Sequence, residues 1–333
     1  MTARRLICLM GPLFLAAGAA QAQTCSATVA GGGITFNNVD PIALSAVTAQ
    51  STLSVTCNWG LLAAPTVRLC VNLGLGNSST SVNPRRMQQG TANTLQYLVR
   101  TGSAAGLVLG STETNNQPLN FQMTWPGGGV NTLTQTFTLY GEILANQPAV
   151  PVTNAATTVY TETFSSASAR LTYQGYALPV LDPGTCPVLL ASSSPIGFTA
   201  TANVTKNCTI SATPMAFPQG STLGTALNAT SSLTLRCSNT LPYAIALSGG
   251  GSNAVTARRM SRTANGVTTT VDYQLYLDAA RSQIWGDGTG GTLRHTANGT
   301  GHPAQVTVYG QVPAQATPVP GDYSDTITAT ILF

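Results

Sequence analysis

The sequence is 333 residues long, only 7% of them are charged, and the formal net charge at pH 7 is +4. Its basic residues are scattered, and adjacent pairs occur only at Arg4-Arg5, Arg85-Arg86 and Arg258-Arg259. Such a diffuse charge argues against a nucleic-acid partner, which needs a concentrated basic patch.

The N-terminal 22 residues have the features of a secretory signal peptide. Two arginines precede an apolar run over 6–17, and Ala20-Gln21-Ala22 supplies small residues at the cleavage positions before Gln23. The apolar run is shorter than the roughly 20 residues that a membrane-spanning helix needs. The sequence therefore predicts an exported chain that is soluble once residues 1–22 are removed.

Six cysteines remain after cleavage, and an even number in an exported chain favours disulfides over metal or redox chemistry. The two short spacings would each close a loop that stabilises the fold by roughly 3 to 4 kcal/mol in the chain-entropy model. Sequence alone leaves other pairings open. The pairs that the spacing suggests are Cys25 with Cys57, Cys70 with Cys186, and Cys208 with Cys237.

Alternating apolar and polar residues predict many short strands, for example over 233–237, 305–309 and 326–333, whereas helix periodicity is almost absent. The chain also repeats itself. The matched motifs are 85–87 with 258–260, 95–98 with 274–277, 139–141 with 308–310, and 159–163 with 322–326. We therefore expect an all-β protein of two tandem β-sandwich domains, 23–190 and 191–333.

Three connecting segments are longer in the first repeat than in the second, and all three are apolar. Loops are normally polar, so any one of them could instead fold back onto its own core. Together they predict an apolar contact surface, because large exposed apolar patches usually mark interaction sites. The predicted surface-binding residues are Trp59, Leu61, Leu62, Trp125, Pro126, Val130, Val150, Pro151 and Val152.

The stretch from Ile196 to Val204 lies between the repeats and is apolar at every second position, as in a strand with one buried face. We expect residues between Gln174 and Val204 to supply the closing strand of the first domain. In this interpretation 196–204 runs on into the first strand of the second domain, and the first domain is complete within the chain.

The second repeat resembles a spore coat U domain. The motifs that carry the resemblance are Cys237, Gly249-Gly250-Gly251, Arg259-Met260, Tyr273-Gln274-Leu275-Tyr276, Ile284-Trp285-Gly286-Asp287-Gly288, Val308-Tyr309-Gly310 and Gly321-Asp322-Tyr323-Ser324-Asp325-Thr326. The first repeat matches more loosely, since Leu107-Val108-Leu109-Gly110 stands where a Trp-Gly motif is expected. The whole chain resembles the two-domain tip adhesin of archaic, Csu-type chaperone-usher pili.

The resemblance implies immunoglobulin-like sandwiches, of which the second lacks its final strand. In that family the gap is filled in trans, first by a periplasmic chaperone and then by a strand of the adjacent pilin subunit, after passage through an outer-membrane usher. The chain would thus end at a pilus tip on the cell surface. The residues expected to contact the chaperone or neighbouring subunit are Ile327, Ala329, Ile331 and Phe333.

A catalytic or metal site is not expected. The two histidines, His295 and His302, share one loop rich in Gly, Thr and Asn, and each remaining cysteine has a disulfide partner. No nucleophile or phosphate-binding motif is present, so we expect no enzyme activity and no cofactor. The arginine pairs of the repeats are expected to be structural and to pair with the carboxylates of Glu162 and Asp325.

The sequence thus favours a tip adhesin that binds a hydrophobic or host surface. Two alternatives remain: a structural pilus or coat subunit with no adhesive role, and a glycan-binding lectin tip. A lectin pocket would need clustered Asp, Asn and aromatic side chains, which the three apolar insertions do not offer. Clustering of the insertions at one end of the first domain would favour adhesion over the structural alternative.

Overall fold

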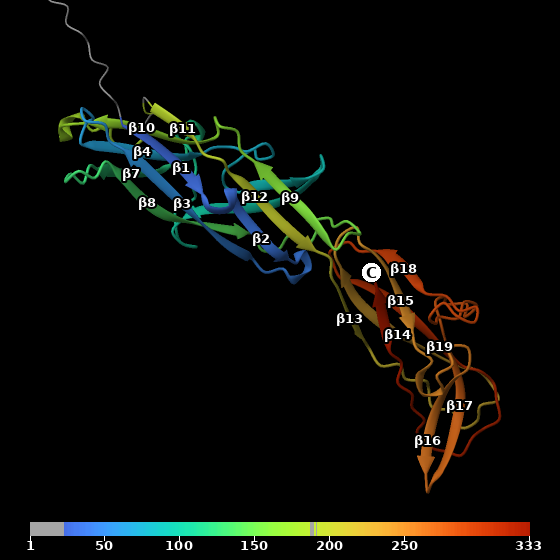
Figure 1. Ribbon diagram of the computed structural model, residues 1–333. Helices are drawn as coiled ribbons and strands as arrows, with labels where there is room; N and C mark the ends of the chain where they lie inside the picture. The colour runs from blue at the N-terminus through green and yellow to red at the C-terminus, as the bar shows by residue number, and fades with distance from the viewer. Residues whose placement is uncertain (1–22, 187–189, 191) are drawn as a thin grey trace, which may run out of the picture.

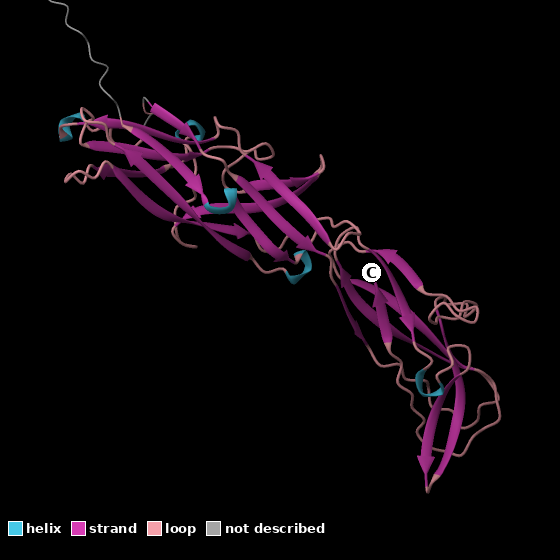
Figure 2. Cartoon of the chain, in the orientation of Figure 1, coloured by secondary structure: helices cyan, strands magenta, loops and turns pink. Residues whose placement is uncertain are grey.

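The computed structural model describes residues 23–186, 190 and 192–333, which form two β-domains arranged end to end (Figure 1). The expected signal peptide, residues 1–22, lies outside the described residues. Strands and loops make up nearly all of the described chain (Figure 2), and none of its helices is long and apolar enough to cross a bilayer. The helices are single 3-10 turns: η1 Ala30–Gly32, η2 Pro41–Ala43, η3 Thr112–Thr114, η4 Pro179–Leu181 and η5 Gly250–Ser252.

The first domain packs two sheets around one core. Its larger sheet has eight strands in the order β1-β3-β8-β6-β5-β9-β12-β2, and its smaller sheet has four in the order β11-β10-β4-β7. The strands are β1 Thr24–Val29, β2 Gly33–Val39, β3 Val47–Asn58, β4 Thr66–Leu73, β5 Arg85–Gln89, β6 Asn93–Thr101, β7 Leu119–Thr124, β8 Thr132–Ile143, β9 Thr157–Thr163, β10 Ala169–Tyr176, β11 Ser192–Pro195 and β12 Thr199–Thr205.

The second domain is smaller. It has a five-stranded sheet in the order β13-β14-β19-β17-β16 and a three-stranded sheet in the order β18-β15-β20. The strands are β13 Cys208–Ala212, β14 Leu227–Cys237, β15 Pro242–Leu247, β16 Arg258–Ala264, β17 Val267–Tyr276, β18 His295–Asn298, β19 Ala304–Val312 and β20 Ala329–Leu332. The expected all-β fold of two tandem domains is therefore confirmed.

The three disulfides join the pairs that the spacing suggested, Cys25 with Cys57, Cys70 with Cys186, and Cys208 with Cys237. The first and third link register partners on adjacent strands at the start of each domain. The second ties the segment after β10 to β4. The equivalent placement of the first and third disulfides supports a common ancestry of the two domains.

The segment 196–204 belongs to the first domain, because β12 pairs with β9 and β2, and its apolar side chains lie in the first core. Alternation is complete, with every second residue of β12 buried. By packing, the boundary therefore lies after Thr205 and not at 190/191. The closing strand of the first domain thus comes from the expected segment, and the chain then continues through Lys206 and Asn207 into β13, which begins at Cys208.

The junction between the domains is hydrogen bonded on both sides of the linker. Val152 N donates to Asn239 O at 2.9 Å, and Thr240 Oγ1 donates to Val152 O at 2.6 Å. Asn207 Nδ2 in the linker donates to Asp40 Oδ2 at 2.7 Å. These contacts hold the second domain against the end of the first at which β12 leaves it.

Candidate functional site

Three loops meet at the end of the first domain that lies farthest from the second (Figure 1). Strand register explains why they meet. In the larger sheet β3 ends at Asn58, opposite Thr132 where β8 begins. In the smaller sheet β4 begins at Thr66, opposite the last residues of both β7 and β10, Thr124 and Tyr176. We call the three loops at this end the distal loops: 59–65 between β3 and β4, 125–131 between β7 and β8, and 177–185 after β10.

The distal loops carry large apolar side chains that face solvent. Leu61 is 97% exposed and Val180 is 85% exposed, values that an apolar side chain reaches only when little else contacts it. The full set of large exposed apolar residues on the distal loops is Leu61, Leu62, Trp125, Val130, Leu178, Val180 and Leu181. Pro126 is also exposed. The structure thus brings five of the sequence-predicted residues together at one end.

The first two distal loops brace one another. Trp59 N donates to Asn131 O at 2.8 Å, and Trp125 N donates to Pro65 O at 2.7 Å. The indole Nε1 of Trp125 closes its own loop by donating to Val130 O at 2.8 Å. The exposed side chains of these loops therefore stand on a backbone with fixed geometry.

The third distal loop is held by an ion pair and a disulfide. The guanidinium of Arg68 on β4 donates to both carboxylate oxygens of Asp182, and Gly184 N donates to Asp182 Oδ1 at 3.0 Å. The bridge from Cys70 to Cys186 anchors the far end of the loop. The hydrogen bond from Arg68, followed by that from Gly184, lowers the pKa of the Asp182 carboxyl.

Acidification is therefore expected to loosen the third distal loop. Because the pKa of Asp182 is lowered in the folded state, its contribution is present above the ordinary aspartate value of about 3.9 and is lost as the pH falls through the lowered value. Pepsin should cleave within 177–185 increasingly over that pH window. The variant Asp182→Asn should be cleaved at a rate independent of pH after correction for pepsin activity, and an identical pH profile in both proteins would contradict the assignment.

Four predicted surface residues do not lie at this end or are not exposed. Trp59 is 4% exposed and packs in the first core, because it continues the inward-facing alternation of Val55 and Cys57 on β3. Val150 and Val152 are each 5% exposed, and Pro151 bridges to the second domain at Asn239. The prediction that Trp59 and 150–152 form part of an exposed apolar surface is wrong for these side chains.

Sequence reasoning missed the third distal loop. Leu178-Pro179-Val180-Leu181 lies after the last motif that the two repeats share, so a comparison of motif spacings did not reach it. A signal was nevertheless present. Four apolar residues directly after a strand that ends at Tyr176 are unusual for a loop, by the same criterion that selected the other insertions.

A second feature of interest is the position of β12, which lies antiparallel to β9 and parallel to β2. Its two central inward-facing residues, Ala200 and Ala202, are fully buried. Their neighbours are large, which leaves space only for a methyl group. The register partners on β2 and β9 are Ile34 and Glu162 for Ala200, and Phe36 and Tyr160 for Ala202.

A buried hydrogen-bond cluster marks the same region of the first domain. Tyr97 Oη donates to Glu162 Oε2 at 2.6 Å, whereas Arg85 donates to backbone oxygens, including Leu109 O at 2.8 Å. Burial lowers the pKa of Arg85, and burial together with the Glu162 charge raises the pKa of Tyr97. The expected pairing of the arginine with Glu162 is wrong, because carbonyl groups take its donors.

The second domain repeats this cluster. Tyr273 Oη donates to Asp325 Oδ2 at 2.7 Å, and Arg258 donates to Trp285 O at 2.9 Å. Here too the arginine does not pair with the carboxylate as expected. Tyr273 is the register partner of Arg258, just as Tyr97 is the register partner of Arg85. The counterpart of Tyr97 is therefore Tyr273 and not Tyr276. The sequence match of 95–98 with 274–277 was therefore misplaced by three residues.

In the second domain the segments 214–220 and 321–327, which hold the counterparts of β2 and of most of β9, contain no assigned strand in the described chain. Their one bridge, Ser261 with Ser324, repeats the pairing of Gln88 with Thr161 between β5 and β9. Between the two segments lie two cavities of about 460 and 660 Å³.

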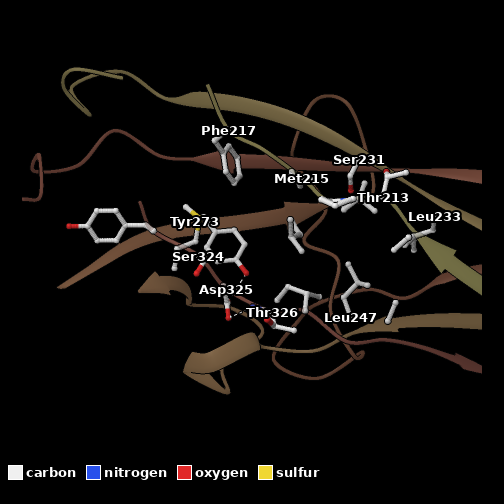
Figure 3. A pocket seen from close by; sticks show the side chains of 18 residues that line it. Thr213, Met215, Phe217, Ser231, Leu233, Leu247, Tyr273, Ser324, Asp325 and Thr326 are labelled. Atoms are coloured by element: carbon white, nitrogen blue, oxygen red, sulfur yellow. Dashed lines mark hydrogen bonds between the residues drawn. The ribbon is translucent and has the colours of Figure 1, made fainter. Parts of the chain in front are cut away.

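Figure 3 shows the wall of the smaller cavity, with Met215 and Phe217 on one side and Tyr273 and Asp325 on another. We call this cavity and its 660 Å³ continuation the second-domain groove. The Tyr273 phenol and the Asp325 carboxylate are hydrogen bonded to each other, so the groove presents mostly apolar side chains.

The predicted chaperone-contact residues lie beside this groove. Ile327 and Ala329 line it, while Ile331 is half-buried and packs on the second core. Phe333 is 46% exposed and its ring lies 5.9 Å from the Lys206 ammonium in the linker. The segment 327–333 thus runs from the groove to the domain junction.

Chemistry-bearing residues do not cluster in the described chain. None of its His, Cys, Asp and Glu residues form a group of three that could hold a metal ion. His295 lies against Trp285 and Tyr243, and burial lowers its pKa. His295 is a half-buried residue at the start of β18, packed on aromatic side chains.

Comparison with known families decides the affiliation. The model of the Spore Coat Protein U domain matches residues 13–166 and 196–330. The chain belongs to the spore coat protein U domain family. "Protein U" of Myxococcus xanthus is 37% identical over 119 residues, which are 34% of this chain and 64% of that relative, so the chain spans less than two thirds of its length.

Two solved tip adhesins are similar to this spore coat U protein at low identity. The structure of the CsuC-CsuE chaperone-tip adhesion subunit complex of Acinetobacter baumannii matches with 17% identity and a TM-score of 0.48, covering 93% of this chain and 100% of that one. The CupB6 tip adhesin of Pseudomonas aeruginosa matches with 11% identity and a TM-score of 0.35, covering 92% and 93%.

Proposed function

We propose that this spore coat U protein is the tip adhesin of a chaperone-usher pilus and attaches cells to nonpolar surfaces through its distal loops. The observation that carries the proposal is the gathering of seven large exposed apolar side chains on three braced loops at one end of the molecule. A single exposed leucine needs no explanation, whereas a cluster at an extremity marks an interaction site.

Attachment to nonpolar material distinguishes this proposal from a lectin tip. Piliated cells are expected to adhere to an alkyl-coated surface far better than to a hydroxylated one of equal roughness, because only the former lets apolar side chains leave water. Free sugars should not compete. Equal attachment to both surfaces, or inhibition by a defined glycan, would instead favour the lectin alternative.

The second domain would join the tip to the pilus. The groove between 214–220 and 321–327 supports the view that this domain takes up a strand in trans, first from a periplasmic chaperone and then from the adjacent subunit. The disulfides fit this route through an oxidising compartment. Export would place the distal loops at the outermost point of the pilus on the cell surface.

Production without the chaperone is therefore expected to fail. Apart from the bridge at Ser324, 214–220 and 321–327 have no strand partner in the described chain, and such open apolar edges invite association with other chains, so the protein should aggregate or be degraded in the periplasm. Co-production of the chaperone should restore a soluble one-to-one complex. A stable chaperone-free monomer whose 321–327 amides are protected from hydrogen exchange would contradict the strand-accepting role.

A further inference from the structure

The strand-accepting role leaves open which strand the groove accepts, and the first domain contains a template for the answer. Because the two domains are repeats, the place that β12 occupies between β2 and β9 corresponds to the second-domain groove. If the walls of the two places match residue by residue, the side chains of β12 indicate the side chains that the groove can take. This inference rests on the proposed function of the groove.

The walls do match on the side of β2. A Cβ atom added at Gly141 would lie 2.6 Å from Phe36 Cζ, and one added at Gly310 would lie 3.0 Å from Phe217 Cζ. Each phenylalanine also makes an edge contact with the cluster tyrosine, with ring centroids 6.3 Å apart in both domains. Phe217 therefore stands where Phe36 stands.

The next position of this wall agrees. The same Gly141 Cβ would lie 2.9 Å from Ile34, two residues before its phenylalanine, and the Gly310 Cβ would collide with the Met215 sulfur. Isoleucine and methionine differ little in volume. The wall of the groove thus has the same order of side chains and the same close approach to a glycine as the wall that faces β12.

The opposite wall agrees as well. Glu162 and Asp325 accept the tyrosine hydrogen bond in the two domains, and the bridge at Ser324 repeats that at Thr161. Tyr323 consequently takes the place of Tyr160, the register partner of Ala202. Large side chains flank both central positions of the groove from both sides.

We infer that the groove accepts a strand in the direction and register of β12, with small residues opposite Met215 and Phe217 and larger apolar residues on either side. The partner is then a chain with an extended segment of the form apolar-x-large-x-small-x-small-x-branched, as in Ile196, Phe198, Ala200, Ala202 and Val204. This direction would carry the partner's next domain away from the first domain, as β12 leads into β13.

The test uses synthetic peptides and the full chain from Gln23 to Phe333, refolded with its disulfides intact at high dilution so that chains do not associate through the open groove. The probe is the peptide of residues 195–206, labelled with a fluorophore. It is expected to bind the groove and to raise the unfolding temperature of the second domain, since a ligand of the folded state stabilises it. β12 itself stays in the first domain, where its covalent link gives it a high effective concentration.

A peptide with Ala202→Leu is the size control. It keeps the alternation and adds apolar area, yet the place opposite Phe217 should not admit it, so its affinity should be about 10- to 100-fold weaker. Binding should return when the same peptide meets the Phe217→Ala chain, in which the opposing ring is gone. Phe217 is half-buried and outside any strand, and the unfolding temperature of the Phe217→Ala chain without peptide establishes that its fold is retained.

The register of the bound peptide is tested separately, by disulfide cross-linking. In the first domain Thr201 pairs with Thr161, and the counterpart of Thr161 in the second domain is the exposed Ser324. A Thr201→Cys peptide should therefore cross-link to a Ser324→Cys chain at least tenfold faster than peptides with cysteine at 199 or 203. The disulfide of register partners Cys25 and Cys57 shows that this geometry permits the bond.

Equal affinity of the 195–206 and Ala202→Leu peptides would overturn the size rule while leaving the groove as a strand-accepting site. Faster cross-linking from 199 or 203 would overturn the register. Absence of binding by the 195–206 peptide, in a chain that still requires its chaperone, would overturn the template itself and not the proposed function.

Discussion

Residues 23–205, produced in an oxidising compartment without the second domain, are expected to fold as a soluble domain that unfolds cooperatively, whereas residues 23–195 are not. The difference between the two is β12. Its register with β9 extends from Thr199 to Thr205, and the apolar side chains from Ile196 to Val204 are at most 4% exposed.

The magnitude decides the outcome. Burial of the five apolar side chains contributes on the order of 5 to 10 kcal/mol gross, an upper limit given a compact unfolded state. A whole domain is stable by only about 5 to 15 kcal/mol. Loss of β12 therefore removes an amount comparable with the whole free energy of unfolding of the domain, and it also leaves β2 without its strand partner.

Point variants keep this prediction clear of truncation artefacts. Within 23–205, Ala202→Asp places a carboxylate in a fully buried site and should abolish the folded state. Its matched control is Asn203→Ala on the outer face of the same strand, which loses a single exposed hydrogen bond to Asn37 and should unfold near the parent temperature. A folded 23–195 fragment, or a domain that folds only with the chaperone, would refute completion within the chain.

Much of the fold follows from local pattern. Alternation over 196–204 predicted both a strand and its buried face, and the repeat predicted two domains. Which sheet the strand joins was only half predictable, because β2 is a parallel partner more than 160 positions away and alternation carries no information about partners. The predicted boundary failed for this reason.

The apolar surface shows a second limit. Unusual length and apolar content led to the prediction that 148–152 is an exposed contact loop, but these properties cannot tell a loop that faces solvent from one that faces a neighbouring domain. Trp59 was predictable in hindsight, since strand parity places it on the inward face with Cys57. Leu178 to Leu181 lay beyond the last shared motif and outside the comparison.

Replacing the apolar side chains of the distal loops by serine is expected to abolish attachment to a hydrophobic surface while pili still assemble. The combined variant changes Leu61, Leu62, Val180 and Leu181, which are the four most exposed large apolar residues of these loops. Full burial of one such side chain stabilises a contact by about 1.5 to 3 kcal/mol. Four partly buried side chains thus supply several kcal/mol per tip, from which the costs of association are subtracted.

The loss of cell attachment should be larger than the loss of affinity of a single tip. A cell attaches through many pili, and each weakened tip lowers the effective concentration of the next. Variants Leu61→Ser/Leu62→Ser and Val180→Ser/Leu181→Ser alone should each reduce attachment about tenfold or more, and the combined variant should lie at background. The side chains that brace the loops, Arg68 and Asp182 among them, remain unchanged, so the loop backbone keeps its geometry.

Leu107→Ser is the matched control. Leu107 is 63% exposed on the same domain but belongs to the turn after β6, away from the distal loops, and its replacement should leave attachment at the parent level. Immunolabelling of intact pili establishes that every variant reaches the cell surface in equal amount. Unchanged attachment by well-piliated cells that carry the combined variant would refute adhesion through the distal loops, and an equal loss in Leu107→Ser would assign attachment to overall surface hydrophobicity and not to the tip.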